Sequence, residues 1–336
     1  MTIPFLNRLF PALLAATLAA PLPAAAACVG ENLFDALPAD QQAAITAAAH
    51  AVPYAQGLMY HAEKAGRRVT LLGTYHLHDD RHQGLLDRLG PAMDDAATLL
   101  VEAGPEEERQ LKAAMAKDAS LAFITDGPTL PERLDEDDWQ RLRAAAAARG
   151  IPGPMAAKMK PWFVTVTLAL SPCAMREAQA GADGLDRQVM DMAAARGLPI
   201  AALEPYDTAF KIFADLTADE EEDMIVTSLS AEARADDYMQ TLADAYFRAE
   251  PRLIWEFSRA DARANSGLTP AEVDHQMDLT EDKLMTRRNR AWLPVIDTAA
   301  AKGPVVVAVG ALHLGGQTGL LKLLADDGWT VTRIDG

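Results

Sequence analysis

The fold is decided by an apolar stretch near the end of the chain, Val305-Val-Val-Ala-Val-Gly310-Ala-Leu-His313-Leu. Such a nearly continuous run of apolar residues suits a strand that is buried on both faces of a parallel sheet. The stretch Thr70-Leu-Leu-Gly73-Thr-Tyr-His76-Leu repeats the pattern of a buried strand that runs into Gly-x-x-His-Leu. The strand-like runs are residues 69–73, 98–102, 199–204, 305–310 and 329–334.

Stretches rich in Ala, Leu and Glu with helical spacing separate these strands. Strands that alternate with helices predict an α/β fold with a mainly parallel central sheet, and the long helical stretches in mid-chain predict a large helical insertion. No low-complexity linker interrupts residues 28–336, which we predict to form a single domain. The predicted helices are residues 106–117, 131–149, 185–196, 217–249 and 280–301.

Residues 1–27 have the features of a secretory signal peptide. Arg8 supplies the positive charge, an apolar segment follows, and Ala25-Ala-Ala27 offers a cleavage site before Cys28. No later stretch reaches the ~18 apolar residues of a membrane span. We therefore predict an exported protein, periplasmic or extracellular, without a transmembrane span.

The charge balance bears on the partners of the protein. The 336 residues include 31 Lys and Arg against 48 Asp and Glu, which gives a formal charge of −17. Nucleic-acid binding needs clustered basic residues, so this balance argues against a nucleic-acid partner. No feature of the sequence specifies an oligomeric state.

Cys28 and Cys173 are the two cysteines of the chain. In an oxidising compartment such a pair tends to form a disulfide, which would tie the mature N-terminus to the middle of the chain. The alternative is a lipid anchor at Cys28, although the preceding Ala-Ala-Ala lacks the large aliphatic residue expected there.

Histidine and glutamate residues stand near the predicted strand ends. His76 and His313 follow the two repeated strands, and Glu102 and Glu204 end two others. In an open parallel sheet, ligands bind beyond the carboxyl ends of the strands. Two histidines and a carboxylate form a common metal-ligand set that leaves a position open for water. The alternative is that each histidine is a packed, hydrogen-bonded residue.

The sequence resembles the TraB/GumN family, which includes the TIKI metalloproteases of animals. The resemblance lies in six segments: LLGTYHLHD, LLVEAGPEE, KPWFVTVTLAL, GLDRQVMDMAAARGLPIAALEP, RRNRAWLPVI and VVVAVGALHLGGQTGLLKLLADDGWTVTRI. It implies a fold similar to the erythromycin-esterase and ChaN-like proteins, built from two related halves. It also implies metal-dependent proteolysis in which His76, His313 and Glu102 hold the metal. Manganese or cobalt is the metal that the resemblance favours, with zinc or iron as alternatives.

The leading functional prediction is an exported metal-dependent hydrolase, most concretely a peptidase, that acts on a peptide or small-molecule substrate. Glu102 or Glu204 would be the general base, and Arg288 would stabilise an oxyanion or form a salt bridge with these carboxylates. Asp186 is expected to accept hydrogen bonds from backbone N–H groups at a helix N-terminus, with a catalytic role as the alternative. The alternative is a non-catalytic envelope protein that binds haem, a metal or a small ligand in the same cleft.

Overall fold

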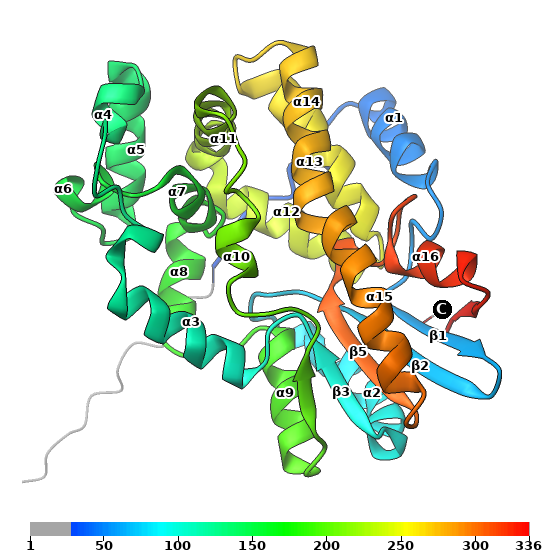
Figure 1. The fold of residues 1–336 in the computed structure, drawn as a ribbon. Coiled ribbons are helices and arrows are strands. Elements are labelled where there is room, and N and C mark those ends of the chain that lie inside the picture. The colour runs from blue at the N-terminus through cyan, green and yellow to red at the C-terminus, as the bar shows by residue number, and fades with distance from the viewer. Residues whose placement is uncertain (1–27, 336) are drawn as a thin grey trace, which may run out of the picture.

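A computed structural model describes residues 28–335, so the predicted signal peptide lies outside the described residues. Six strands form one mixed sheet in the order β4-β3-β5-β2-β1-β6 (Figure 1). β2, β5, β3 and β4 run parallel, whereas β1 is antiparallel to both of its neighbours, β2 and β6. The predicted α/β class with a mainly parallel sheet is confirmed. The strands are β1 Met59–Lys64, β2 Arg67–Thr74, β3 Thr98–Val101, β4 Ile200–Ala202, β5 Val305–Gly310 and β6 Thr330–Arg333.

Strand β1 was not predicted from the sequence. Its residues, Met-Tyr-His-Ala-Glu-Lys, include no β-branched side chain, so the local strand signal is weak. The strand forms because Ala65 and Gly66, with φ of 51° and 78°, make a two-residue turn that folds it back on β2. The turn, together with pairing to β2 and β6, therefore outweighs the weak strand preference of these residues.

Strand β5 lies at the centre of the core, and all of its residues are buried. Val306 and Ala308 face a cluster that contains helices α2 (Gln83–Asp95) and α9 (Leu185–Ala195). Val305, Val307 and Val309 face the opposite cluster, with helices α15 (Arg287–Ala300) and α16 (Leu320–Asp326). Helices thus cover both faces of the sheet, which explains the continuous apolar character of β5.

The remaining helices gather beyond the end of the sheet from which β3 and β4 lead into α3 and α10 (Figure 1). Part of this helical layer has its own apolar core, in which Leu142, Val164 and Ile225 are buried. The long predicted helix at residues 217–249 divides into α11 and α12. The helices are α1 Ala39–His50, α3 Pro105–Lys117, α4 Leu130–Arg133, α5 Glu136–Ala148, α6 Gly153–Ala156, α7 Pro161–Leu168, α8 Pro172–Gln179, α10 Thr208–Lys211, α11 Ala218–Ser230, α12 Ala235–Phe247, α13 Pro251–Asn265 and α14 Pro270–Glu281.

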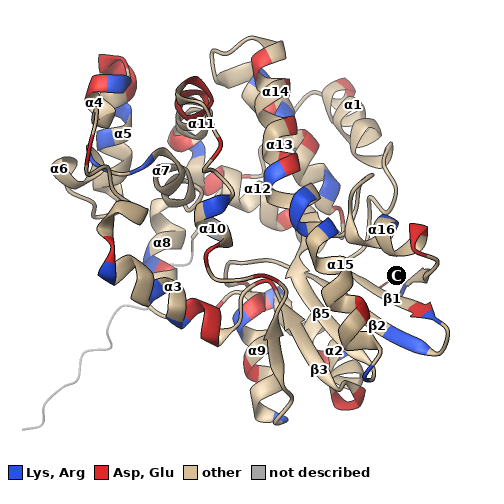
Figure 2. Ribbon diagram, viewed as in Figure 1, with Lys and Arg blue, Asp and Glu red and all other residues tan. Residues whose placement is uncertain are grey.

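Acidic residues occupy the first turns of several of these helices, among them α3, α5 and α11 (Figure 2). Negative charge at a helix N-terminus is favourable because it opposes the positive end of the helix dipole. These acidic residues therefore stabilise the helix ends at which they stand.

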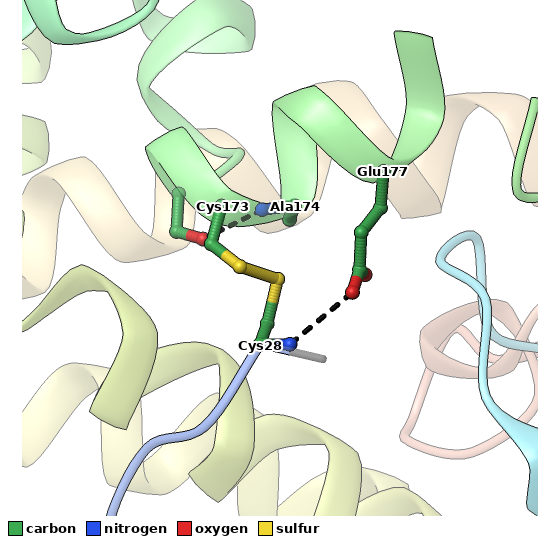
Figure 3. Close-up of a disulfide and its surroundings, with 5 residues drawn as sticks. Cys28, Cys173, Ala174 and Glu177 are labelled. Carbon is green, nitrogen blue, oxygen red and sulfur yellow. Dashed lines mark hydrogen bonds between the residues drawn. A yellow bond between two sulfur atoms is a disulfide. The ribbon is translucent and has the colours of Figure 1, made fainter. Parts of the chain in front are cut away.

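Cys28 and Cys173 form a disulfide with a Cα–Cα distance of 5.6 Å, as predicted (Figure 3). The bond attaches the first described residue to helix α8. Because this sulfur of Cys28 is in the disulfide, it is not free to carry a lipid. A disulfide is compatible with export. Within residues 28–335, no helix combines the length and the apolar character that crossing a bilayer requires.

Candidate functional site at the strand ends

The four predicted strand-end residues follow four adjacent parallel strands. Across the sheet they come in the order Glu204, Glu102, His313 and His76, after β4, β3, β5 and β2. The two Gly-x-x-His motifs are offset by one residue, since Thr74 of β2, and not Gly73, pairs with Gly310 of β5. The two histidines also lie in different environments. His313 ends a short 3-10 helix and is buried, whereas the His76 side chain is 65% exposed.

Arg288, from the first turn of α15, links both glutamates and one histidine. Its Nε and Nη2 donate to the two oxygens of Glu204, at 2.9 and 2.7 Å, and Nη2 also donates to Glu102 Oε2 at 2.6 Å. Its Nη1 lies 3.2 Å from His313 Nε2 and donates to Leu284 O at 3.0 Å. All five guanidinium N–H groups therefore have an acceptor.

The Glu102 carboxylate is held ionised. Its Oε1 accepts a hydrogen bond of 2.7 Å from the Gly310 N–H. Burial opposes ionisation, but His313, Arg288, His76 and this N–H together lower the pKa of Glu102 to about 2. A Cβ placed on Gly310 would lie 3.0 Å from His76 Nε2 and 3.3 Å from Glu102 Oε1, so these two atoms come together over the bare Cα of this glycine.

His313 is fixed by Asn289 on the same helix as Arg288. His313 Nδ1 lies 2.7 Å from Asn289 Oδ1, and Asn289 Nδ2 donates to Thr318 O at 2.8 Å and to His313 O at 3.3 Å. Because Nδ2 is committed to two carbonyls, Oδ1 must accept, which places the proton of His313 on Nδ1. Burial lowers the pKa of His313 to about 4, so the ring is neutral with its Nε2 lone pair facing Arg288.

His76 is fixed by Asp186 at the start of α9. His76 Nδ1 lies 2.7 Å from Asp186 Oδ2, and Thr74 Oγ1 donates to Asp186 Oδ1 at 2.5 Å. The charge of Asp186 raises the pKa of His76 to about 9. The expectation that Asp186 accepts backbone N–H groups was wrong. The reason is that Gly184 lets α9 start against the backbone of His76, which turns the Asp186 side chain toward the histidine.

The comparisons with known proteins identify the family of the chain. A model of the TraB/PrgY/gumN family matches residues 58–333. The chain belongs to this family. It is also similar to the protein YbaP of Escherichia coli (strain K12) and to YbaP of Shigella flexneri. Each is 24% identical over 258 residues, which cover 77% of this chain and 88% of the relative. The residues matched by the TraB/PrgY/gumN model include all six strands and every strand-end residue described above.

The metal that the TraB/GumN resemblance implies can be tested against the donor atoms. Two imidazoles and an ionised carboxylate are suitable ligands for a divalent ion. His313 Nε2 lies 3.8 Å from Glu102 Oε1, which is within the separation of two ligands of one metal. Over residues 28–335, however, the one group of three donors that all lie within 4.8 Å of one another is Cys28, Cys173 and Glu177. Its sulfurs are in a disulfide and so are not thiolates. The donor types at the strand ends therefore fit a metal, whereas His76 lies too far from at least one of the other two donors for a closed three-ligand site.

Sequence reasoning missed three features of the site. Asn289 lies beside Arg288 in the sequence, but nothing local links it to His313. The segment Asp282–Thr286, just before α15, is π-helical, and such turns are frequent at functional sites. Trp292 donates its indole N–H to Glu204 Oε2 at 3.0 Å and packs against His313, with ring centroids 4.5 Å apart and the ring planes tilted by 37°. The spacing of Arg288, Asn289 and Trp292 on one helix is the signal that would have indicated their common role.

Proposed function

We propose that this chain is an exported metal-dependent hydrolase that cleaves a peptide or a related small amide or ester. One observation carries the proposal: each predicted histidine ligand has its Nδ1 held by a side-chain oxygen, from Asp186 for His76 and from Asn289 for His313. This is the usual arrangement around metal-binding histidines, because it fixes the ring and directs Nε2 away from the side chain that holds it. At His313 the ion would use the Nε2 lone pair that now faces Arg288 Nη1 at 3.2 Å, so metal binding would replace this hydrogen bond. In this proposal His76, His313 and Glu102 hold the ion.

A divalent metal would polarise the substrate carbonyl and acidify a bound water. The resemblance favours manganese or cobalt, with zinc or iron as alternatives. Of the three ligands, His76 has the room to adjust its position, since 65% of its side chain is exposed. His313 and Glu102 are held rigidly by Asn289, Gly310 and Arg288.

Arg288 and Glu204 act as positioning residues in this proposal. Every N–H of Arg288 is already donated within the protein, so the arrangement favours the salt-bridge role over the oxyanion role. Glu204 accepts from both Arg288 and Trp292. The pair thus holds Glu102 in place, and Glu102 is the carboxylate with an oxygen directed toward His76.

The decisive experiment measures metal content by mass spectrometry on protein purified from the periplasm. We expect about one equivalent of a divalent metal in the wild type, and its loss in His76→Ala, whose exposed side chain can be removed without a cavity. His275→Ala, at a side chain that is 63% exposed and remote in sequence from the motifs, is the matched control. Cleavage of a peptide library that chelator abolishes would support hydrolysis.

Two results would contradict the proposal in different ways. The absence of metal from the wild type, even after incubation with each ion, would reject the metal site. Metal that is bound at His76, with no cleavage of any peptide, amide or ester probe, would favour the non-catalytic alternative of a ligand-binding envelope protein.

A further inference from the structure

A second candidate site lies in the helical layer. A cavity of about 660 Å³ opens between α7, α10 and the loop that precedes α4, and Figure 1 shows α7, α10 and α11 as neighbours. Trp162, Phe210 and Phe213 form much of its wall, and the Trp162 and Phe210 rings pack edge to face at 5.8 Å. This size and aromatic lining are typical of sites for small organic ligands.

The charged side chains around the cavity differ in whether they have partners. Arg133 is paired with Glu221 at 3.0 Å and with Glu222 at 3.2 Å. Asp126 is exposed, so water solvates its charge. Lys160 is half-buried and has neither an ion pair nor a side-chain hydrogen bond among the residues that the structure describes. A cation beside aromatic walls, with part of its hydration removed, is complementary to a ligand anion.

We propose that this cavity binds an organic carboxylate with an apolar body, whose carboxylate pairs with Lys160 and whose apolar part packs on Trp162 and Phe210. The peptide form of this ligand is a C-terminal aromatic or aliphatic residue. The free form is an aliphatic acid. Both present the same chemistry to the cavity.

The chain segment that carries Phe210 and Phe213 also runs from the strand-end site to the wall of the cavity. This segment starts just after Glu204, and near its other end Asp215 pairs with Lys283 and with Arg287, the neighbour of Arg288. If the chain is the proposed hydrolase, the cavity takes the C-terminal side of a peptide substrate; this placement rests on the proposed function, whereas the binding itself does not.

Calorimetry with N-acetyl-L-phenylalanine and its neutral amide tests the binding without metal or turnover. We expect the acid to bind the wild type at least ~10-fold more tightly than the amide. Lys160→Met should lower the affinity for the acid to that for the amide and leave the amide unchanged. Lys302→Met, at an exposed lysine, is the matched control and should have no effect. Phe210→Ala should weaken both ligands.

The remaining outcomes separate the sources of the ligand and the two proposals. Binding of octanoate that depends on Lys160, without binding of N-acetyl-L-phenylalanine, would support the carboxylate site and identify a free acid as its source. Three results would overturn the inference. They are equal affinity for the acid and its amide, no effect of Lys160→Met on acid binding, and no binding of either N-acetyl-L-phenylalanine or octanoate at millimolar concentration. Since His76→Ala should leave acid binding intact, failure of the metal proposal would not be confused with failure of this one.

Discussion

Asn289 Oδ1 accepts a hydrogen bond from His313 Nδ1 over 2.7 Å, and this contact sets the tautomer of the buried histidine. Asn289 itself is held because its Nδ2 donates to the carbonyls of Thr318 and His313. The backbone after β5 thus fixes the orientation of the Asn289 side chain, and Asn289 in turn fixes the orientation of the imidazole. The orientation of His313 is consequently a property of the fold and not of its own motif.

This relationship predicts the nitrogen spectrum of His313. In metal-free protein at neutral pH, imidazole ¹⁵N shifts should show a neutral ring protonated at Nδ1. Asn289→Ala should release this preference and lower the free energy of unfolding by about 1–3 kcal/mol, because two buried carbonyls lose their donor. Asn265→Ala, on an exposed asparagine of α13, should change the free energy of unfolding little. A wild-type ring protonated at Nε2 would refute this reading.

Arg288→Met should destabilise the protein strongly. Its removal leaves Glu102 and Glu204, both largely buried, without their cation, and breaking such a pair costs about 3–5 kcal/mol. Urea unfolding measures this loss. Adding Glu204→Gln should restore part of it, since one uncompensated charge is then removed. Arg290→Met, two residues away on an exposed position, is the control. If Arg288→Met and Arg290→Met lowered the free energy of unfolding equally, the loss would come from replacing an arginine in α15 and not from the unpaired carboxylates.

Gly184→Ala should disturb both stability and His76. A Cβ at this position would lie 2.0 Å from the carbonyl oxygen of His76, so α9 must move away from the turn after β2. We expect a lower free energy of unfolding and, if His76 binds metal, weaker metal affinity. Gly84→Ala, where a Cβ meets nothing within 4 Å, should be neutral or stabilising by up to about 1 kcal/mol. Unchanged thermal stability of Gly184→Ala would contradict the close packing.

Acid should destabilise the protein through His82. This side chain is buried against Tyr75, Tyr246 and Phe247, and its Nε2 has no partner among the described residues. Desolvation outweighs the attraction of Asp79 and Asp186, and His78 and Arg81 add to it, so the pKa of His82 falls to about 4. Because the unfolded chain binds this proton near pH 6.5 and the folded one does not, the His82 contribution is full above about pH 6.5 and is lost between there and pH 4.

Between pH 6.5 and 4, His82 should make the free energy of unfolding fall with decreasing pH, with a slope that approaches about 1.4 kcal/mol per pH unit. Urea unfolding at several pH values measures it. His82→Phe, which keeps an aromatic ring in the cluster and removes the titrating nitrogen, should lower the slope between pH 6.5 and 4 by this amount. The slope that remains includes the contribution of His313, whose pKa burial also lowers. The same slope in His82→Phe would assign the acid sensitivity to other groups.

The sequence by itself determined the parts of this protein whose signals are local. The apolar runs that became β2, β3 and β5 bury on two faces whatever surrounds them, so their strands were predicted. Their parallel arrangement followed from the helices between them, and this arrangement brings the strand-end histidines and glutamates to one edge. The pairing of Cys28 with Cys173 followed from their being the two cysteines of the chain.

Only the tertiary structure decided how these residues meet. His313 is buried against Asn289 and Trp292 of α15, whereas His76 is exposed, although their motifs read alike. Strand β1 forms because it has β2 and β6 to pair with, and not because of its own preference. Asp186 and Asn289 orient the two histidines from sites 110 and 24 residues away in the sequence. Such contacts depend on register and helix placement, which are set by packing across the whole sheet and leave no mark in the neighbouring sequence.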